Sequence, residues 1–368
     1  MKNKYSSLYI HIPFCDCICS YCDFPKLLKK TGYEEKYIEA LIFELSQLPV
    51  KTFSTIYVGG GTPTALDDNL FNRLFSYIRK NIKCLGEFSV EANPESMSYE
   101  KALLMAQNGV NRVSLGVQTI DDSILKILNR NHNANMVIKA INNIKSVGIN
   151  NVNMDFIYGL PNQEDIEKLK RDIDFALSFD PNHLSFYPLQ IEEGTVLFNK
   201  KVKEPLQDEL DDYYETIISK LKEKGIERYE ISNFAKSGFE SKHNLTYWHS
   251  DDYYACGLGA TGFVDGLRYK NTLNINKYIN HEFIYEKNFE DLSDQEFDFL
   301  MLNLRLVSGF SLNDFYQRFN HSFLIDYKDE IEKVKDYLDI DEDICKVKEK
   351  YLYILDSILV DLLHFKEN

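Results

Sequence analysis

The chain has 368 residues and a formal net charge of -15, and 44% of its residues are hydrophobic and 13% aromatic. This composition excludes a disordered chain, and the length leaves room for a large core and a second, smaller domain. The negative charge excludes nucleic acid as the main partner and limits membrane contact to a peripheral one, because both surfaces attract lysine and arginine. The sequence lacks a signal-peptide pattern and any run approaching the ~20 apolar residues of a membrane span, so we expect a cytoplasmic protein.

Short β-rich runs alternate with amphipathic helical patterns through the first half of the chain. The predicted strands are residues 8–12, 55–58, 88–91, 112–117, 152–157 and 183–187. The predicted helices between them are residues 33–48, 69–82, 98–108, 133–147 and 164–178, and Gly109 and Gly148 stand where two of them should end. Alternating strand and helix units predict parallel strands with right-handed crossovers, in a barrel or an open sheet.

Polar residues and glycines gather where these predicted strands end. They are Gly59, Gly60 and Gly61, then Glu91 and Asn93, then Gln118, then Asp155, and finally Pro188 and Gln190. In α/β barrels the chemistry lies at the carboxyl ends of the strands, so we expect these residues to converge on one mouth. Six units rather than eight predict a partial (β/α)6 barrel that is open on one side.

The pattern changes after the sixth strand. A helix is predicted over residues 205–224, followed by an irregular segment over residues 227–263 and then by helices over residues 294–306 and 312–319. We therefore expect a barrel over residues 1–200, a barrel extension over residues 201–280 and a small, mainly α-helical C-terminal domain over residues 281–368.

Four of the seven cysteines lie within residues 15–22. In a reducing compartment such crowding favours metal binding or redox chemistry over disulfides. Cys15, Cys19 and Cys22 have the spacing C-x3-C-x2-C, and three thiolates can hold three irons of a 4Fe-4S cluster while the fourth iron stays open to another ligand. Cys17 is expected to point away from Cys15 and Cys19 in an extended loop and to be a bystander.

Two other interpretations of the cysteines stay open, a zinc site and simple reduced thiols. Zinc usually takes four ligands in paired C-x2-C knuckles, and the sequence has no second knuckle. A zinc-stabilised structural protein would be colourless and free of iron when purified.

Residues 9–24, YIHIPFCDCICSYCDF, closely resemble the opening of radical S-adenosylmethionine (SAM) proteins. The resemblance is to the branch that contains oxygen-independent coproporphyrinogen III oxidase and the haem chaperones of the HemW type. It continues in order through GGGTPT (59–64), VEANPE (90–95), RVSLGVQT (112–119), NRNH (129–132), NMDFIYGLP (153–161) and HNLTYW (243–248). The resemblance implies a radical SAM fold in which the open iron binds the amino and carboxylate groups of SAM.

The resemblance also assigns cofactor-binding residues. Tyr9 and Tyr21 match positions that line the SAM site. Gly60, Gly61 and Thr62 are expected to leave backbone amides exposed for the amino-acid portion of SAM, which is compatible with the simpler interpretation of a tight strand-to-helix turn. The remaining positions that match SAM contacts, some of them to a second SAM molecule, are Glu91, Gln118, Arg130 and Asp155. Salt bridges at strand ends are the alternative for the two carboxylates.

The HNLTYW block points to the haem chaperones. By the resemblance, His243 would ligate haem iron or orient a propionate, and Tyr247 and Trp248 would stack on the porphyrin. A lone histidine is more often structural. His249, His11 and His132 are weaker alternatives.

Phe24 separates the two branches, because coproporphyrinogen oxidases carry a further cysteine at this position. The leading hypothesis is therefore a haem chaperone that carries one 4Fe-4S cluster and SAM and passes haem to acceptor proteins such as respiratory enzymes. The alternative is an enzyme, either coproporphyrinogen III oxidase or a related methyl transferase that uses SAM. No catalytic residue is assigned, and the sequence leaves open whether the protein forms a homodimer.

Overall fold

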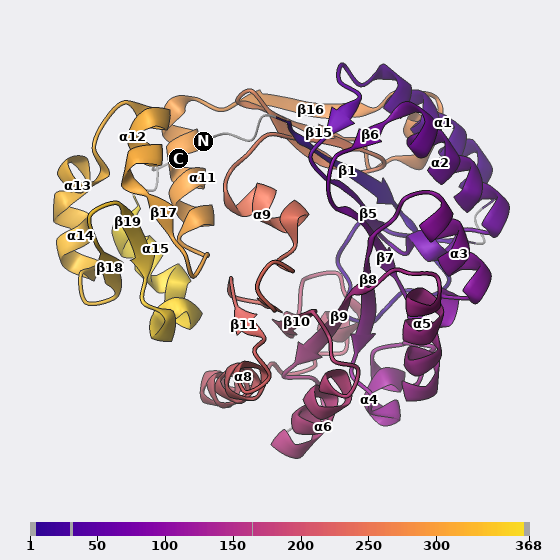
Figure 1. The fold of residues 1–368 in the computed structure, drawn as a ribbon, viewed down its shortest axis with the longest axis horizontal. Coiled ribbons are helices and arrows are strands. Elements are labelled where there is room, and N and C mark those ends of the chain that lie inside the picture. Colours follow the sequence, from indigo (N-terminus) through magenta and orange to yellow (C-terminus); the bar gives the residue numbers. More distant parts are fainter. Residues whose placement is uncertain (1–4, 30–31, 164, 364–368) are drawn as a thin grey trace.

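The computed structural model describes residues 5–29, 32–163 and 165–363. Its main element is a 12-stranded sheet with the order β11-β12-β10-β9-β8-β7-β5-β1-β13-β14-β15-β16. Adjacent strands in the centre are parallel: β1 (Ser7–Ile12), β5 (Ile56–Gly60), β7 (Phe88–Ala92), β8 (Arg112–Gln118), β9 (Asn151–Tyr158) and β10 (His183–Pro188). These are the six predicted strands. Figure 1 shows them along an arc with helices on its outer side.

The crossover helices also follow the prediction. They are α1 (Glu34–Gln47), α2 (Asp68–Asn81), α3 (Tyr99–Gln107), α5 (Ala134–Ser146) and α6 (Ile166–Leu177), with a short additional helix α4 (Asp122–Ile127). Gly109 and Gly148 follow the ends of α3 and α5 with φ of +88° and +89°, the left-handed conformation that stops a helix at low cost. Glu164, predicted as the first residue of the fifth crossover helix, lies outside the described residues.

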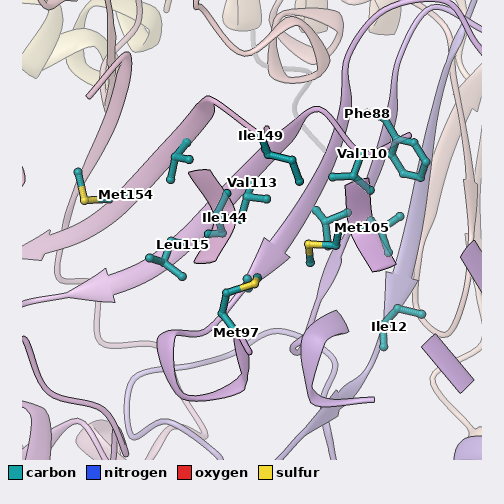
Figure 2. Packing of buried hydrophobic residues seen from close by; sticks show 14 of the residues in the cluster. Ile12, Phe88, Met97, Met105, Val110, Val113, Leu115, Ile144, Ile149 and Met154 are labelled. Carbon is teal, nitrogen blue, oxygen red and sulfur yellow. The ribbon is translucent and has the colours of Figure 1, made fainter. Parts of the chain in front are cut away.

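The main hydrophobic core lies between the arc of strands and the outer helices. Figure 2 shows Met105 of α3 and Ile144 of α5 near Val113 and Leu115 of β8, together with Met154 of β9. Each such buried side chain contributes about 1.5–3 kcal/mol through removal of apolar surface from water. Because apolar residues fill the outer face of the strands, the alternate residues on the inner face are free to be polar.

The segment after β10 is more regular than predicted. It contains α7 (Val196–Asn199), α8 (Gln207–Lys222), β11 (Glu227–Arg228), β12 (Asn233–Ala235), α9 (Lys242–Trp248), β13 (Tyr253–Cys256), β14 (Thr261–Val264), β15 (Leu267–Asn271), α10 (Ile275–Ile279) and β16 (Ile284–Phe289). The expectation of an irregular segment over residues 227–263 was wrong. Its short strands take their register from distant partners, since β13 pairs with β1 and β12 with β10, and sequence patterns do not reveal such pairing.

The C-terminal part has its own buried cluster, which includes Phe299, Phe315 and Phe323. Its helices are α11 (Leu292–Asn303), α12 (Leu312–Phe319), α13 (Phe323–Asp326), α14 (Lys328–Val334) and α15 (Leu355–Leu362). A small antiparallel sheet that was not predicted, β17 (Phe310–Ser311), β19 (Ile344–Val347) and β18 (Leu338–Ile340), packs among them. In Figure 1 this part stands apart from the arc, with α9 between them.

Two pairs of short parallel strands complete the fold. They are β2 (Phe14–Cys15) with β3 (Leu27–Leu28), and β4 (Thr52–Phe53) with β6 (Lys83–Cys84). The first pair closes the base of the loop that carries the cysteines. Among the described residues, no helix combines the length and the apolar character needed to cross a membrane.

Candidate cofactor site

A cavity of about 430 Å³, which we call the first cavity, lies at the carboxyl ends of the central strands. It brings together most of the sequence-predicted residues: Cys15, Cys19, Tyr21, Cys22, Gly60, Gly61, Thr62, Glu91, Gln118, Arg130 and Asp155. These residues come from the cysteine loop and from four neighbouring strands and their following turns. The predicted convergence of the strand ends on one mouth is therefore confirmed.

The three predicted cluster ligands have free thiols in the wall of this cavity. The Thr62 hydroxyl lies 3.7 Å from the Cys15 sulfur, and Nη1 of Arg130 lies 3.5 Å from the Cys19 sulfur. Within the described residues the thiols are not drawn together into a preformed metal-binding group. Three thiols on one loop, with donors aimed at two of the sulfurs, nevertheless match the donor set of a 4Fe-4S cluster with one open iron.

Cys17 does not point away from its neighbours, so that expectation was wrong. Its single S–H has two acceptors within reach, the Cys19 sulfur and the carbonyl oxygen of Asn129 at 3.4 Å. The alternation expected for an extended loop fails because the chain bends at Asp16 and Cys17. The hydrogen bond from Cys17, with the positive charge of Arg130, lowers the pKa of the Cys19 thiol, which favours the thiolate needed for metal binding.

The glycine turn after β5 packs tightly against the cysteine loop. A Cβ atom on Gly61 would lie 2.7 Å from the Pro13 carbonyl oxygen and 2.9 Å from the Cys15 sulfur, and one on Gly60 would lie 2.5 Å from the His11 ring. Gly60 also has a φ of +117°, which other residues rarely adopt. These positions therefore need glycine for close approach.

The expectation that this turn leaves its amides exposed was wrong. The Gly60 N–H donates to Glu91 Oε2 at 2.9 Å, the Gly61 N–H to the Ile12 carbonyl at 2.8 Å and the Thr62 N–H to the Phe14 carbonyl at 2.9 Å. The turn thus completes the wall of the cavity and positions Glu91, rather than offering free donors.

Two half-buried carboxylates face the cavity. Glu91 accepts a second hydrogen bond from the Tyr57 hydroxyl at 2.8 Å, and burial raises its pKa to about 7 against these two stabilising bonds. Asp155 accepts from Ser114 at 2.8 Å and from Asn153 at 2.7 Å, and burial raises its pKa as well. Such carboxylates can hold ribose hydroxyls or an ammonium group.

Gln118 and Arg130 occupy constrained positions. Gln118 has a φ of +67° at a register shift between β8 and β9, a backbone conformation that is costly for a residue other than glycine. Arg130 is buried, with Nη2 donating to Asn93 Oδ1 at 3.0 Å and to the Gly116 carbonyl at 2.5 Å. Its guanidinium is therefore directed at the cysteine loop and the end of β8.

Tyr9 lies outside the first cavity, in the wall of a second one of about 480 Å³. The second cavity lies between β1, β13, β14 and β15 on one side and α9 and α11 on the other. Its wall includes Tyr9, Phe24, Tyr247, Trp248, Tyr253, Phe263 and Met301. Two of the three predicted haem residues thus share a cavity that is rich in aromatic side chains.

His243, the third predicted haem residue, lines neither cavity and is fully buried. Its Nδ1 pairs with the Thr55 hydroxyl and its Nε2 with the Tyr247 hydroxyl, both at 2.8 Å. Burial lowers its pKa to about 3, so the ring is neutral. Ligation of iron would require the release of one of these two partners.

Sequence reasoning did not identify several polar residues of the first cavity, among them Arg112, Asn153 and Ser185. Arg112 is 2% exposed, with its guanidinium near Ser89 and Glu87. The available signal was the alternation of polar residues along β8, β9 and β10, since residues two apart in a strand share one face. That face is the interior of the barrel.

Comparison with known proteins gives the family. Residues 9–174 match the Radical SAM superfamily. The chain is 38% identical over 338 residues to the heme chaperone HemW of Lactococcus lactis subsp. lactis (strain IL1403), which covers 88% of this chain and 87% of that protein. The chain belongs to the HemW family of radical SAM proteins. HemW of Bacillus subtilis (strain 168) is also 38% identical, over 332 residues, covering 86% and 87% of the two chains.

HemW of Escherichia coli (strain K12) is 33% identical over 315 residues, covering 82% of this chain and 83% of that protein. Among solved structures, coproporphyrinogen III oxidase (HemN) of Escherichia coli superimposes with a TM-score of 0.84 at 21% identity, covering 97% of this chain and 90% of that one. At this identity the likeness shows the fold alone. It confirms a partial radical SAM barrel with a mainly α-helical C-terminal part.

Phe24, the residue expected to distinguish the HemW branch, lies between the two cavities. Its side chain is 63% exposed and lines both the first and the second cavity. It directly follows Cys22 and Asp23, so the cysteine loop forms part of the partition between the two cavities.

Proposed function

We propose that this member of the HemW family is a cytoplasmic haem chaperone that carries a 4Fe-4S cluster and SAM and passes haem to acceptor proteins such as respiratory enzymes. The observation that carries the proposal is the identity of 33–38% to several HemW proteins over most of the chain. The aromatic second cavity, with Tyr247 and Trp248 in its wall, supports a role in binding a flat ring system.

The residues of the first cavity would hold the cofactors. Cys15, Cys19 and Cys22 would ligate the cluster, and a bound cluster with SAM supplies one-electron chemistry in this superfamily. Arg130 stabilises the Cys19 thiolate from one side of the loop. Glu91 presents an acceptor held in place by Tyr57 and the Gly60 amide.

Other residues would complete the SAM site. Tyr21 and Gln118 line the same cavity, and Asp155 is fixed by Ser114 and Asn153 on its floor. Gly61 and Thr62 shape the wall beside Cys15. Tyr9 would act from the second cavity rather than on SAM.

For haem, Tyr247 and Trp248 are the proposed contact residues. We assign His243 to holding Tyr247, because both of its ring nitrogens are already engaged. The side chain of Tyr247 is then fixed at the cavity wall, where its ring meets that of Tyr253 edge to face with the centroids 4.7 Å apart.

The test is a titration of the cluster-reconstituted protein with haemin, followed by transfer to an apo haem protein. Stable binding and transfer are expected. The Tyr247→Ala variant should bind haemin more weakly, and Tyr99→Phe, a change on an exposed residue of α3, serves as control. If the wild type does not bind haemin, the proposal is wrong.

The alternative is oxygen-independent coproporphyrinogen III oxidase activity, because the sequence motifs resemble that branch of the superfamily as well. Anaerobic incubation with SAM, a reductant and coproporphyrinogen III tests it. Formation of protoporphyrinogen would support the oxidase, and its absence with intact cluster and SAM binding would exclude it. Phe24, in the position where oxidases carry a further cysteine, leads us to expect no product.

A further inference from the structure

A continuous series of side-chain contacts, through half-buried residues and the buried His243, joins the two cavities. The Tyr57 hydroxyl donates to Glu91 in the wall of the first cavity at 2.8 Å. The Tyr57 ring stacks on His243, with centroids 5.1 Å apart and an interplanar angle of 27°. His243 in turn pairs with the Tyr247 hydroxyl at 2.8 Å, and Tyr247 lines the second cavity. No exposed group interrupts the series between Glu91 and Tyr247.

The second cavity has the features of a ligand site. Its volume of about 480 Å³ lies within the roughly 300–1,000 Å³ that is usual for small-molecule sites. Aromatic rings are the largest group in the wall, which also contains Asp251 and Asp298. The Trp248 indole nitrogen is buried without a hydrogen-bond partner in the described part of the chain. The one arginine in the wall, Arg268, is paired with Glu290 and Asp298. The wall therefore favours a flat, mainly apolar molecule whose charged groups remain at the solvent side.

We infer that the second cavity binds a flat aromatic ligand, and that Tyr57 links its occupancy to that of the SAM cavity. The ligand is haem, and this identification rests on the proposed function. Tyr57 itself lines the first cavity, and it contacts Glu91 on one side and His243 on the other, so a ligand in that cavity can act on it directly or through Glu91.

The physical basis is the close packing of the protein interior. When a ligand draws Glu91 toward itself, the Tyr57 hydroxyl must follow this carboxylate or lose its hydrogen bond to it. The Tyr57 ring lies against Tyr9, with centroids 6.2 Å apart, as well as against His243, and both connect to the second cavity. A packed interior transmits such displacements because it has little free volume to absorb them.

The first experiment tests the site. Trp248 is the single tryptophan of the chain, so all tryptophan fluorescence arises from a residue in the wall of the second cavity. Haemin should quench this fluorescence in a saturable way. Thr261→Phe, which places a larger ring in the cavity wall, should weaken haemin binding at least tenfold, and Thr52→Phe in β4, outside both cavities, should not. Equal affinities for both variants would overturn the placement of the site.

The second experiment tests the link. The Kd of haemin is measured with and without saturating SAM, and the Kd of SAM with and without haemin. Linkage requires the two ratios to be equal, and coupled sites typically show ratios of roughly 5 to 150. We expect a ratio in this range for the wild type and a ratio near one for Tyr57→Phe, which keeps the ring but loses the bond to Glu91. Tyr99→Phe should retain the wild-type ratio.

A ratio of one in the wild type, with both ligands bound, would overturn the link and leave the haem function intact. If haemin fails to bind at all, the haem assignment falls, and the link is then judged by SAM alone. In that case equilibrium dialysis first shows that SAM binds to the wild type and to Tyr57→Phe. SAM should then change Trp248 fluorescence in the wild type and not in Tyr57→Phe. An unchanged Trp248 signal in the wild type would then overturn the link.

Discussion

Tyr57 and His243 stack inside the barrel with ring centroids 5.1 Å apart. The histidine is held by Thr55, which lies 188 residues before it in the chain. The pair joins β5, which leads into the glycine turn of the SAM site, to α9, which carries the HNLTYW block. Glu87 strengthens this attachment by accepting hydrogen bonds from the first amides of α9, those of Lys242 and His243. The HNLTYW block is therefore part of the barrel interior.

The first prediction concerns His243. Replacement by alanine leaves the Thr55 and Tyr247 hydroxyls buried with one partner fewer, so we expect the free energy of unfolding to fall by about 2–4 kcal/mol. Urea unfolding of the apo-protein measures the loss, and His243→Gln should recover part of it. An alanine variant that is as stable as the wild type but no longer binds haemin would instead identify His243 as an iron ligand.

The second prediction separates the four cysteines of the loop. Cys15→Ser, Cys19→Ser and Cys22→Ser should each lose the cluster, because the assignment gives each of these thiolates one iron to hold. Cys17→Ser should retain iron and sulfide, since a hydroxyl can still donate to Cys19. Iron and sulfide analysis after anaerobic reconstitution measures both. The assignment would be contradicted if Cys17→Ser lost the cluster while one of the other three variants kept it.

The third prediction concerns the contact between the C-terminal part and the barrel. Nε of Arg305 donates to the fully buried carboxylate of Glu230 at 2.8 Å, and its guanidinium lies 4.6 Å from the centre of the Trp248 ring. Arg305→Met leaves a buried charge without its counter-ion, which typically costs about 3–5 kcal/mol. Thermal unfolding should show this loss, and Trp248 fluorescence should change at the same time.

Arg73 provides the control for this prediction. Arg73→Met removes an arginine whose ion pairs with Glu35 and Glu39 are exposed, and it should change stability by less than about 1 kcal/mol. Equal effects of the Arg305 and Arg73 changes would show that the Glu230 contact contributes little.

The fourth prediction is a pH dependence of stability. Burial raises the pKa of Glu44 from 4.5 to about 7, against hydrogen bonds from Tyr278, the Gly257 amide and Asn271. Between these two pKa values the folded chain holds a proton that the unfolded chain has released, so stability falls as the pH rises from about 5 to 8. We expect a loss on the order of 2 kcal/mol from this group.

Glu44→Gln should remove this part of the pH dependence, which urea unfolding at pH 5 and pH 8 measures. Glu39→Gln, on the exposed side of α1, should leave the slope unchanged. The raised pKa would be contradicted if the wild type lost no more stability than Glu44→Gln between pH 5 and pH 8.

Much of the barrel could be predicted because its strands and helices alternate with clear periodicity, and because Gly109 and Gly148 mark helix ends. The convergence of Glu91 and Asp155 followed from the rule that parallel strands end on one side. What could not be predicted depends on distant partners. The pairing of β13 with β1 and the engagement of the Gly61 amide by Ile12 are set by tertiary contact, and the direction of Cys17 by a local bend.

The central claim, a haem chaperone of the HemW family, is tested most directly by titrating the anaerobically reconstituted protein with haemin while recording Trp248 fluorescence, and then adding an apo haem protein. The account predicts saturable quenching, followed by recovery of the fluorescence as the acceptor takes up haem. Absence of quenching, or quenching that no acceptor reverses, would contradict it.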